Sequence, residues 1–179
     1  MKKTLFSILA TFSVTASAAN YFSVDVDYVR AAGNGTDSVA QYIRAGTDQA
    51  GIQLGLQGRT ASLKDSGGLL SSVEVTAGTS LGFVSPFVGI ARDNGFNGAN
   101  AYTYGLVGAT TGMPVGPGFA LAGVKARVAS TEDHLTKQVV TFGTYSIPVT
   151  KTMSVNLNLS KSFQDIKEDA AGVGIGFKF

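Results

Sequence analysis

Apolar and polar residues alternate one by one along much of this chain, and the stretch 153–163 is the clearest case. One side of an extended chain would there carry Met153, Val155, Leu157 and Leu159, and the other side only Ser and Asn. Because successive side chains of a β-strand point to opposite faces of its sheet, the stretch is predicted to be a strand with one apolar and one polar face.

The same alternation recurs along the rest of the chain. The predicted strands cover residues 21–30, 50–60, 69–79, 83–92, 101–113, 118–129, 136–148, 152–164 and 170–179. A length of about ten residues is what a tilted strand needs to cross the hydrocarbon core of a membrane. The polar faces consist mainly of Gly, Ser, Asn and Gln, which suits the inside of a narrow barrel better than the water-facing side of a soluble sandwich.

The connections between these strands are of two kinds. Short turns with Pro or Gly, at 79–82, 114–118 and 148–151, alternate with longer polar connections at 66–68, 93–100, 130–134 and 165–169. This asymmetry is typical of outer-membrane barrels, whose strand number is even in bacteria. The nine strands above are an odd number, so the region 38–46, which alternates poorly, is predicted to form a tenth strand. We expect an all-β, antiparallel, up-and-down transmembrane β-barrel of ten strands, or of eight if 31–49 is irregular.

The first eighteen residues have the three parts of a secretory signal peptide. Lys2 and Lys3 precede an apolar run at 5–14, and Ala16-Ser17-Ala18 forms a small-x-small cleavage site. We expect cleavage after Ala18, a single barrel domain over 19–179, and a location in the outer membrane of a Gram-negative cell. Loss of the two lysines would take Lys+Arg from 14 to 12, equal to the 12 Asp+Glu.

Composition excludes several other classes of protein. The chain has 44% hydrophobic and 15% charged residues, 23 glycines and no cysteine, which argues against disorder, disulfides, thiolate metal sites and iron–sulfur clusters. Positive charge is not clustered as nucleic-acid binding requires. No apolar run reaches the length of a membrane-spanning helix. We expect no cofactor and no metal.

Two motifs resemble those of a known group of proteins. The last eight residues, GVGIGFKF, resemble the C-terminal assembly signal of outer-membrane proteins, with its alternating Val173, Ile175, Phe177 and Phe179. The stretch 85–91, SPFVGIA, is similar to the start of a strand in small barrels of the OmpA-like and opacity-protein type. The resemblance implies that the barrel-assembly machinery is a partner during biogenesis.

Barrels of this group usually carry tryptophan in the aromatic belts at the membrane surfaces, and this chain has no Trp. Other aromatic residues near predicted strand ends are expected to replace it. These are Tyr21, Tyr28, Tyr102, Tyr104, Phe163, Phe177 and Phe179.

Candidate catalytic groups are sparse. His134 is the only histidine and follows Glu132 and Asp133, but no nucleophile motif accompanies it, so a solvated loop residue is the simpler interpretation. Gly172 to Gly176 spell GxGxG, yet the helix that a phosphate-binding loop requires cannot follow so close to the C-terminus. We expect a protein that is not an enzyme.

Charged residues on the polar faces are the more informative candidates. Lys or Arg facing lipid near the midplane would cost on the order of 2–4 kcal/mol, so these side chains are expected inside the barrel. They form a hypothetical lumen charge network of Asp25, Asp27, Arg59, Glu74, Lys125 and Arg127, with Lys178 beside it and Arg44 less definite. The network either plugs the lumen with ion pairs or forms a charged constriction for ions.

Arg30 and Lys161 instead fall on the apolar face, at the expected extracellular rim. There they either reach lipopolysaccharide phosphates or are simply tolerated at the interface.

The expected function is that of a non-catalytic outer-membrane barrel with a structural or interaction role, in contact with lipid and lipopolysaccharide. The alternative is a narrow porin-like channel for ions or small solutes, and a rim enzyme is a third hypothesis. Connections shorter than about ten residues do not indicate a specific protein ligand, because barrels that bind receptors project longer loops.

Overall fold

A computed structural model describes residues 19–31, 37–49, 51–63, 69–94, 101–131, 137–164 and 167–179. The expected signal peptide, residues 1–18, and His134 lie outside the described residues.

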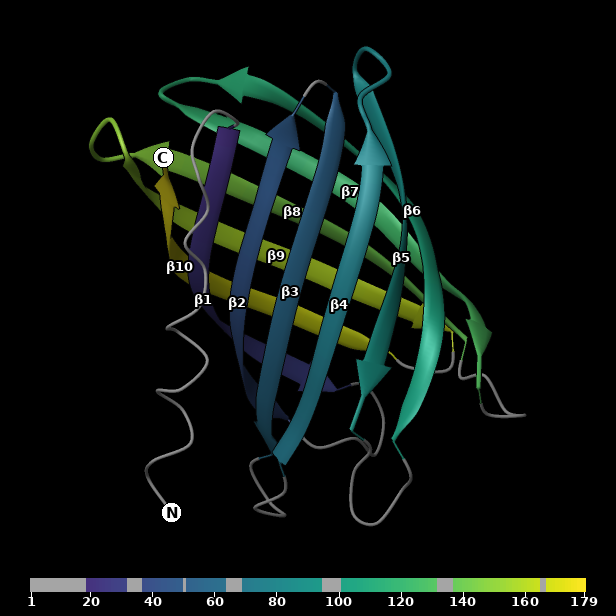
Figure 1. Ribbon diagram of the computed structural model, residues 1–179. Helices are drawn as coiled ribbons and strands as arrows, with labels where there is room; N and C mark the ends of the chain where they lie inside the picture. The colour runs from purple at the N-terminus through teal and green to yellow at the C-terminus, as the bar shows by residue number, and fades with distance from the viewer. Residues whose placement is uncertain are drawn as a thin grey trace.

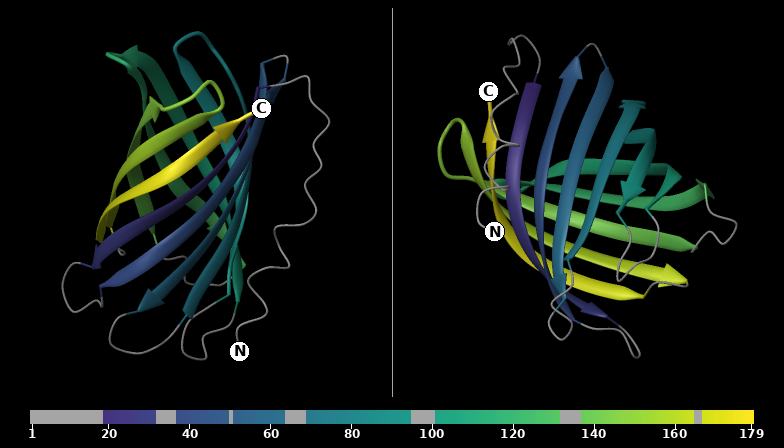
Figure 2. Two further views of the ribbon diagram at one scale, coloured as in Figure 1. Left: turned by 90° about the vertical axis from the view of Figure 1, so that its left-hand side faces the viewer. Right: turned by 60° about the horizontal axis from the view of Figure 1, so that its bottom comes forward.

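Ten antiparallel strands close into one barrel in chain order (Figure 1). They are β1 Ala19–Ala31, β2 Ser38–Gln49, β3 Ile52–Leu63, β4 Leu69–Thr79, β5 Val84–Asp93, β6 Tyr102–Val115, β7 Gly118–Ser130, β8 Gln138–Pro148, β9 Met153–Gln164 and β10 Glu168–Lys178. The expectation of ten strands is confirmed, because the weakly alternating region 38–46 forms β2. Closure comes from β1, which pairs with both β2 and β10 (Figure 2, left).

The two ends of the barrel differ as the sequence predicts. Connections 80–83, 116–117 and 149–152 lie at one end, here called the short-turn end, together with the start of β1 and the end of β10. Gly82 and Gly116 have positive φ angles of 70° and 55°, which residues with a Cβ rarely adopt. The opposite end, the loop end, carries four connections of five to eight residues, of which 94–101 is the longest, and the three-residue connection 165–167.

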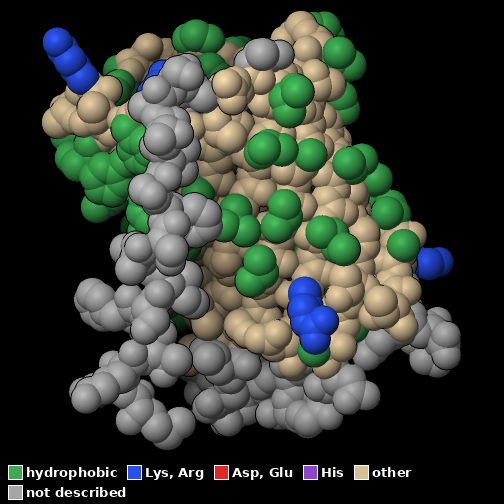
Figure 3. Space-filling model, viewed as in Figure 1, with side chains coloured by type: hydrophobic (Ala, Val, Ile, Leu, Met, Phe, Trp, Pro, Cys, Tyr) green, Lys and Arg blue, Asp and Glu red, His purple; other side chains and the backbone are tan. Residues whose placement is uncertain are grey.

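Apolar side chains cover the outer wall of the barrel in rows that run from strand to strand. Val24 pairs with Ile175, which pairs with Val155, and all three are exposed. Figure 3 shows hydrophobic side chains spread over the outer wall, with few Lys and Arg side chains among them. Among the described residues, no helix is long and apolar enough to cross a membrane.

Glycines inside the barrel make room for the large side chains of neighbouring strands. A Cβ on Gly123 would lie 2.8 Å from Cε2 of Phe142, and one on Gly112 would lie 2.7 Å from the Phe119 ring. In β10, a Cβ at Gly174 would overlap the carboxylate of Asp25. Small residues on one strand thus allow the next strand to fill a narrow interior.

Two apolar clusters lie inside the barrel towards the loop end. Val29, Ala40 and Ala61 form the first, on β1, β2 and β3. Ala91, Tyr104 and Leu106 form the second, on β5 and β6. The interior is therefore polar in part and apolar in part, whereas the sequence predicts a mainly polar inner face.

The prediction that Tyr102 and Tyr104 belong to an aromatic belt is wrong. Tyr104 is only 7% exposed and faces the interior, in a cluster that Tyr102 packs against. The stretch 101–113 carries apolar residues on both faces, so its alternation does not say which face is inside. Tyr21 also faces inward, because it lines the internal cavity and its ring lies against Gly46.

Candidate functional site in the barrel interior

Inward-facing side chains of all ten strands surround one internal space, here called the lumen. A cavity of about 940 Å³ fills much of it, from Tyr21 and Thr150 near the short-turn end to Arg59 and Glu168 near the loop end. The six charged residues of the predicted network, and also Arg44 and Lys178, line this cavity.

Asp25 is the most deeply buried charged group among the described residues, with 1% of its side chain exposed. Its Oδ2 lies 2.5 Å from Nη1 of Arg44 on the neighbouring strand β2 and accepts a hydrogen bond of 2.8 Å from Ser23 Oγ. Its Oδ1 accepts a hydrogen bond of 2.9 Å from Asn158 Nδ2 on β9. One cation and two neutral donors thus compensate the buried carboxylate, as burial of a charge requires.

A second ion pair crosses the lumen. Lys125 Nζ on β7 lies 2.6 Å from Glu74 Oε2 on β4, and the side chains are 20% and 14% exposed. Strands β5 and β6 separate these two strands in the barrel wall. The pair therefore spans the interior instead of following the sheet.

A third group surrounds Arg127, whose side chain is 10% exposed. Its Nη2 lies 3.3 Å from Asp93 Oδ2, and its Nη1 donates a hydrogen bond of 2.9 Å to the Tyr102 hydroxyl. The guanidinium carbon lies 4.1 Å from the centre of the Tyr104 ring. This contact explains why both tyrosines turn inward: cation–π attraction and a hydrogen bond stabilise them beside the arginine.

The fourth ion pair is looser and also crosses the lumen. Arg59 Nη2 on β3 lies 3.9 Å from Glu168 Oε2 on β10. Near this pair, Arg59 Nε and Asp27 Oδ1 are buried without a hydrogen-bond partner. Asp27 is 4% exposed, and no ion pair within the described residues includes it.

Two partners in these pairs were missed in the sequence, and a third, Arg44, was only a less definite member of the predicted network. Asp93 and Glu168 lie at the strand ends of β5 and β10, within segments that the sequence predicts to be connections. Arg44 lies in β2, whose alternation is poor. If the alternation inside β5 and β10 is continued to the strand ends, Asp93 and Glu168 fall on the inward face.

One wall of the lumen is apolar. Phe87 on β5, Leu106 on β6, Leu121 on β7 and Phe142 on β8 line the cavity. The charged and amide side chains lie mainly on β1 to β4 and on β9. The interior thus has a polar side and an apolar side, joined by Lys125 and Arg127.

The other candidates from the sequence lie on the outer face or in the middle of a strand. Val173, Ile175 and Phe177 of the predicted assembly signal point outward and are exposed, and the backbone of Phe179 pairs with that of Asn20. The GxGxG stretch lies in the middle of β10. Within the described residues, no group of three or more His, Cys, Asp and Glu side chains could hold a metal ion.

An apolar outer wall around a closed antiparallel barrel with a charged interior defines the fold of transmembrane β-barrels. Solved structures of outer-membrane barrels resemble the chain. The β-domain of the Bordetella autotransporter BrkA matches with a TM-score of 0.53 and 12% identity, over 92% of this chain and 100% of that one. The chain therefore has the fold of outer-membrane β-barrels.

Two further structures match less well. The translocator domain of the autotransporter NalP from Neisseria meningitidis has a TM-score of 0.49 and 13% identity, over 93% of this chain and 90% of that one. Neisserial surface protein A has a TM-score of 0.46 and 10% identity, over 92% and 98%. No protein-family profile and no curated protein sequence matches the chain.

Proposed function

We propose that the protein is an integral outer-membrane β-barrel of the Gram-negative cell envelope, with a structural or interaction role and without catalytic activity. The observation that carries the proposal is the outer wall, on which rows of apolar side chains such as Val24, Ile175 and Val155 are exposed. Such rows are stable next to lipid tails and costly next to water. Lipid and lipopolysaccharide are the partners that this surface fits.

A plugged lumen is the second part of the proposal. The pairs Glu74–Lys125 and Arg59–Glu168 each connect strands that two others separate in the wall, and the apolar clusters lie inside towards the loop end. Charges in a confined interior are stable when they are paired, and a paired network blocks the path that an ion would take.

A narrow channel is the alternative function, and the cavity of about 940 Å³ favours it. Bilayer conductance distinguishes the two. The refolded protein should show no discrete openings if the network is a plug, and the double variant Glu74→Gln with Lys125→Gln should begin to conduct. Lys151→Gln, at an exposed position in a turn, serves as the control. Regular openings of the unchanged protein, unaffected by the double variant, would refute the plug.

Three simpler measurements test the remaining parts. A closed barrel should resist SDS until it is boiled, so migration that does not depend on heating would contradict insertion as a barrel. The mass of the protein recovered from membranes should correspond to cleavage after Ala18. Incubation with envelope lipids should give no product, and turnover that His134→Ala abolishes would show that the protein is an enzyme.

A further inference from the structure

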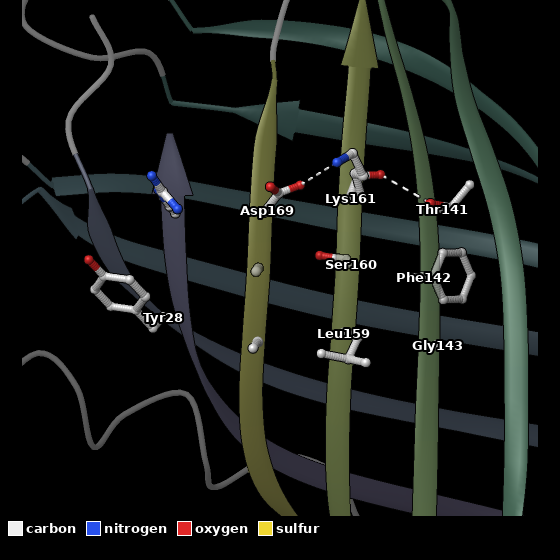
Figure 4. A pocket seen from close by; sticks show the side chains of 11 residues that line it. Tyr28, Thr141, Phe142, Gly143, Leu159, Ser160, Lys161 and Asp169 are labelled. Atoms are coloured by element: carbon white, nitrogen blue, oxygen red, sulfur yellow. Dashed lines mark hydrogen bonds and ion pairs between the residues drawn. The ribbon is translucent and has the colours of Figure 1, made fainter. Parts of the chain in front are cut away.

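A groove on the outer wall near the loop end crosses β1, β10, β9 and β8. Its volume is about 520 Å³. Figure 4 shows the side chains that line it. Two register rows line it. The row nearer the loop end is polar and consists of Arg30, Asp169, Lys161 and Thr141, each paired with the next. The following row is formed by Tyr28, Ala171, Leu159 and Gly143.

The second row explains why the wall is hollowed. Tyr28 and Leu159 are exposed by 51% and 67% and stand out from the wall, while Ala171 between them and Gly143 beyond Leu159 bring almost no side chain. In a membrane, such a hollow has to be filled by hydrocarbon, because an empty space loses its dispersion contacts.

Of the two cations in the polar row, Lys161 alone has an ion-pair partner among the described residues. Lys161 Nζ lies 3.3 Å from Asp169 Oδ1, so these two charges are paired. Nearby, Asp37 accepts hydrogen bonds from the Tyr28 hydroxyl, at 2.5 Å, and from the Ala31 amide, at 3.2 Å. Arg30 is exposed and makes no ion pair with the described part of the chain.

We propose that this groove binds a phosphorylated glycolipid, the lipid A part of lipopolysaccharide. One acyl chain lies against Ala171 and Gly143, and a phosphate contacts the Arg30 guanidinium and the free N–H groups of Lys161. Planar guanidinium groups bind phosphate through paired, charge-assisted hydrogen bonds. The inference rests on the proposed location in the outer membrane, where short turns face the periplasm and the loop end faces the leaflet that holds this lipid.

The test uses the full barrel refolded in detergent micelles, with diphosphorylated lipid A and its enzymatically dephosphorylated form as probes. Native mass spectrometry measures the fraction of protein that retains each lipid. Two variants perturb the groove: the double variant Arg30→Gln with Lys161→Gln removes the cations, and Gly143→Leu fills the floor. Gly143 tolerates a side chain, since a Cβ there has only an ordinary contact of 3.6 Å with the Leu121 carbonyl.

Arg92→Gln is the matched control, because Arg92 is an exposed residue near the end of β5, away from the groove. We expect the diphosphorylated lipid to bind roughly tenfold more weakly to each groove variant, the loss that corresponds to about 1.4 kcal/mol. The control should bind like the unchanged protein, and the dephosphorylated lipid should bind weakly throughout.

Several results would overturn the proposal. Equal retention of both lipids would exclude phosphate recognition, and full retention by Gly143→Leu would place the lipid elsewhere. A dimer that Gly143→Leu dissociates would show that a second copy of the chain occupies the groove. Heat-dependent migration, measured on the same samples, shows separately whether the barrel itself is formed. Migration that does not depend on heating would refute the proposed function and not merely this site.

Discussion

Removing the ammonium group of Lys125 tests whether the cross-lumen ion pair stabilises the barrel. At 2.6 Å, the attraction between Lys125 Nζ and Glu74 Oε2 amounts to about 6 kcal/mol at an effective dielectric constant of about 20. Desolvation of two largely buried ions offsets several kcal/mol of this. Loss of one partner is costly because the other charge stays buried without compensation.

We therefore expect Lys125→Met to lower the free energy of unfolding by about 3 kcal/mol. Combining it with Glu74→Gln should restore part of the loss, because no unpaired carboxylate then remains. A double-mutant cycle should give a coupling energy of about 2 kcal/mol. The Arg59–Glu168 pair, at 3.9 Å and with side chains 23% and 32% exposed, should show a coupling below about 1 kcal/mol.

The assay is urea unfolding of the refolded protein in phosphatidylcholine vesicles. Because the chain has no tryptophan, the heat-dependent band shift on gels and tyrosine fluorescence report the folded fraction. Linear extrapolation gives the free energies of the four proteins in the cycle. Additive effects of Lys125→Met and Glu74→Gln would refute the reasoning, since they would mean that the two charges do not stabilise each other.

Two further predictions concern the inner and outer faces of the wall. Gly123→Val should lower the unfolding free energy by about 1–3 kcal/mol, because its Cβ would displace the Phe142 ring. Gly58→Ala is the control in the same urea titration and should have little effect, because a Cβ at that position meets nothing within 4 Å. Val75→Arg, on the exposed outer face of β4, should cost about 2–4 kcal/mol in vesicles. Ile52→Arg, at an exposed position at the start of β3 near the short-turn end, should cost at most about 1 kcal/mol, and equal costs at both positions would contradict a lipid-facing wall.

Sequence reasoning locates the strands well because period-two alternation is a local property. The outward rows of β1, β9 and β10 follow from single stretches such as 153–163, and each needs no knowledge of its neighbours. The region 38–46 required a different argument, since only the even number of strands in such barrels identified it as β2.

The candidate site could be predicted only in part. That Asp25, Glu74, Lys125 and Arg127 lie inside follows from alternation and from the cost of charge in lipid. Tyr104 could not be placed in this way, because its strand has apolar residues on both faces and contact with Arg127 stabilises the ring inside. Asp93 was missed for another reason, namely that it lies where the strand ends.

The sequence by itself determined the architecture of this protein: alternating strands of membrane-crossing length, turns of two kinds, and small residues where the interior is crowded. Only the tertiary structure decided which charges meet. Lys125 and Glu74 are 51 residues apart in the chain and belong to strands that are not neighbours. Closure of the barrel brings them together, because the curved sheet turns the inward side chains of β4 and β7 towards each other across the interior. The outer groove has the same origin, since its lining residues come from both ends of the chain and become neighbours only where β10 pairs with β1.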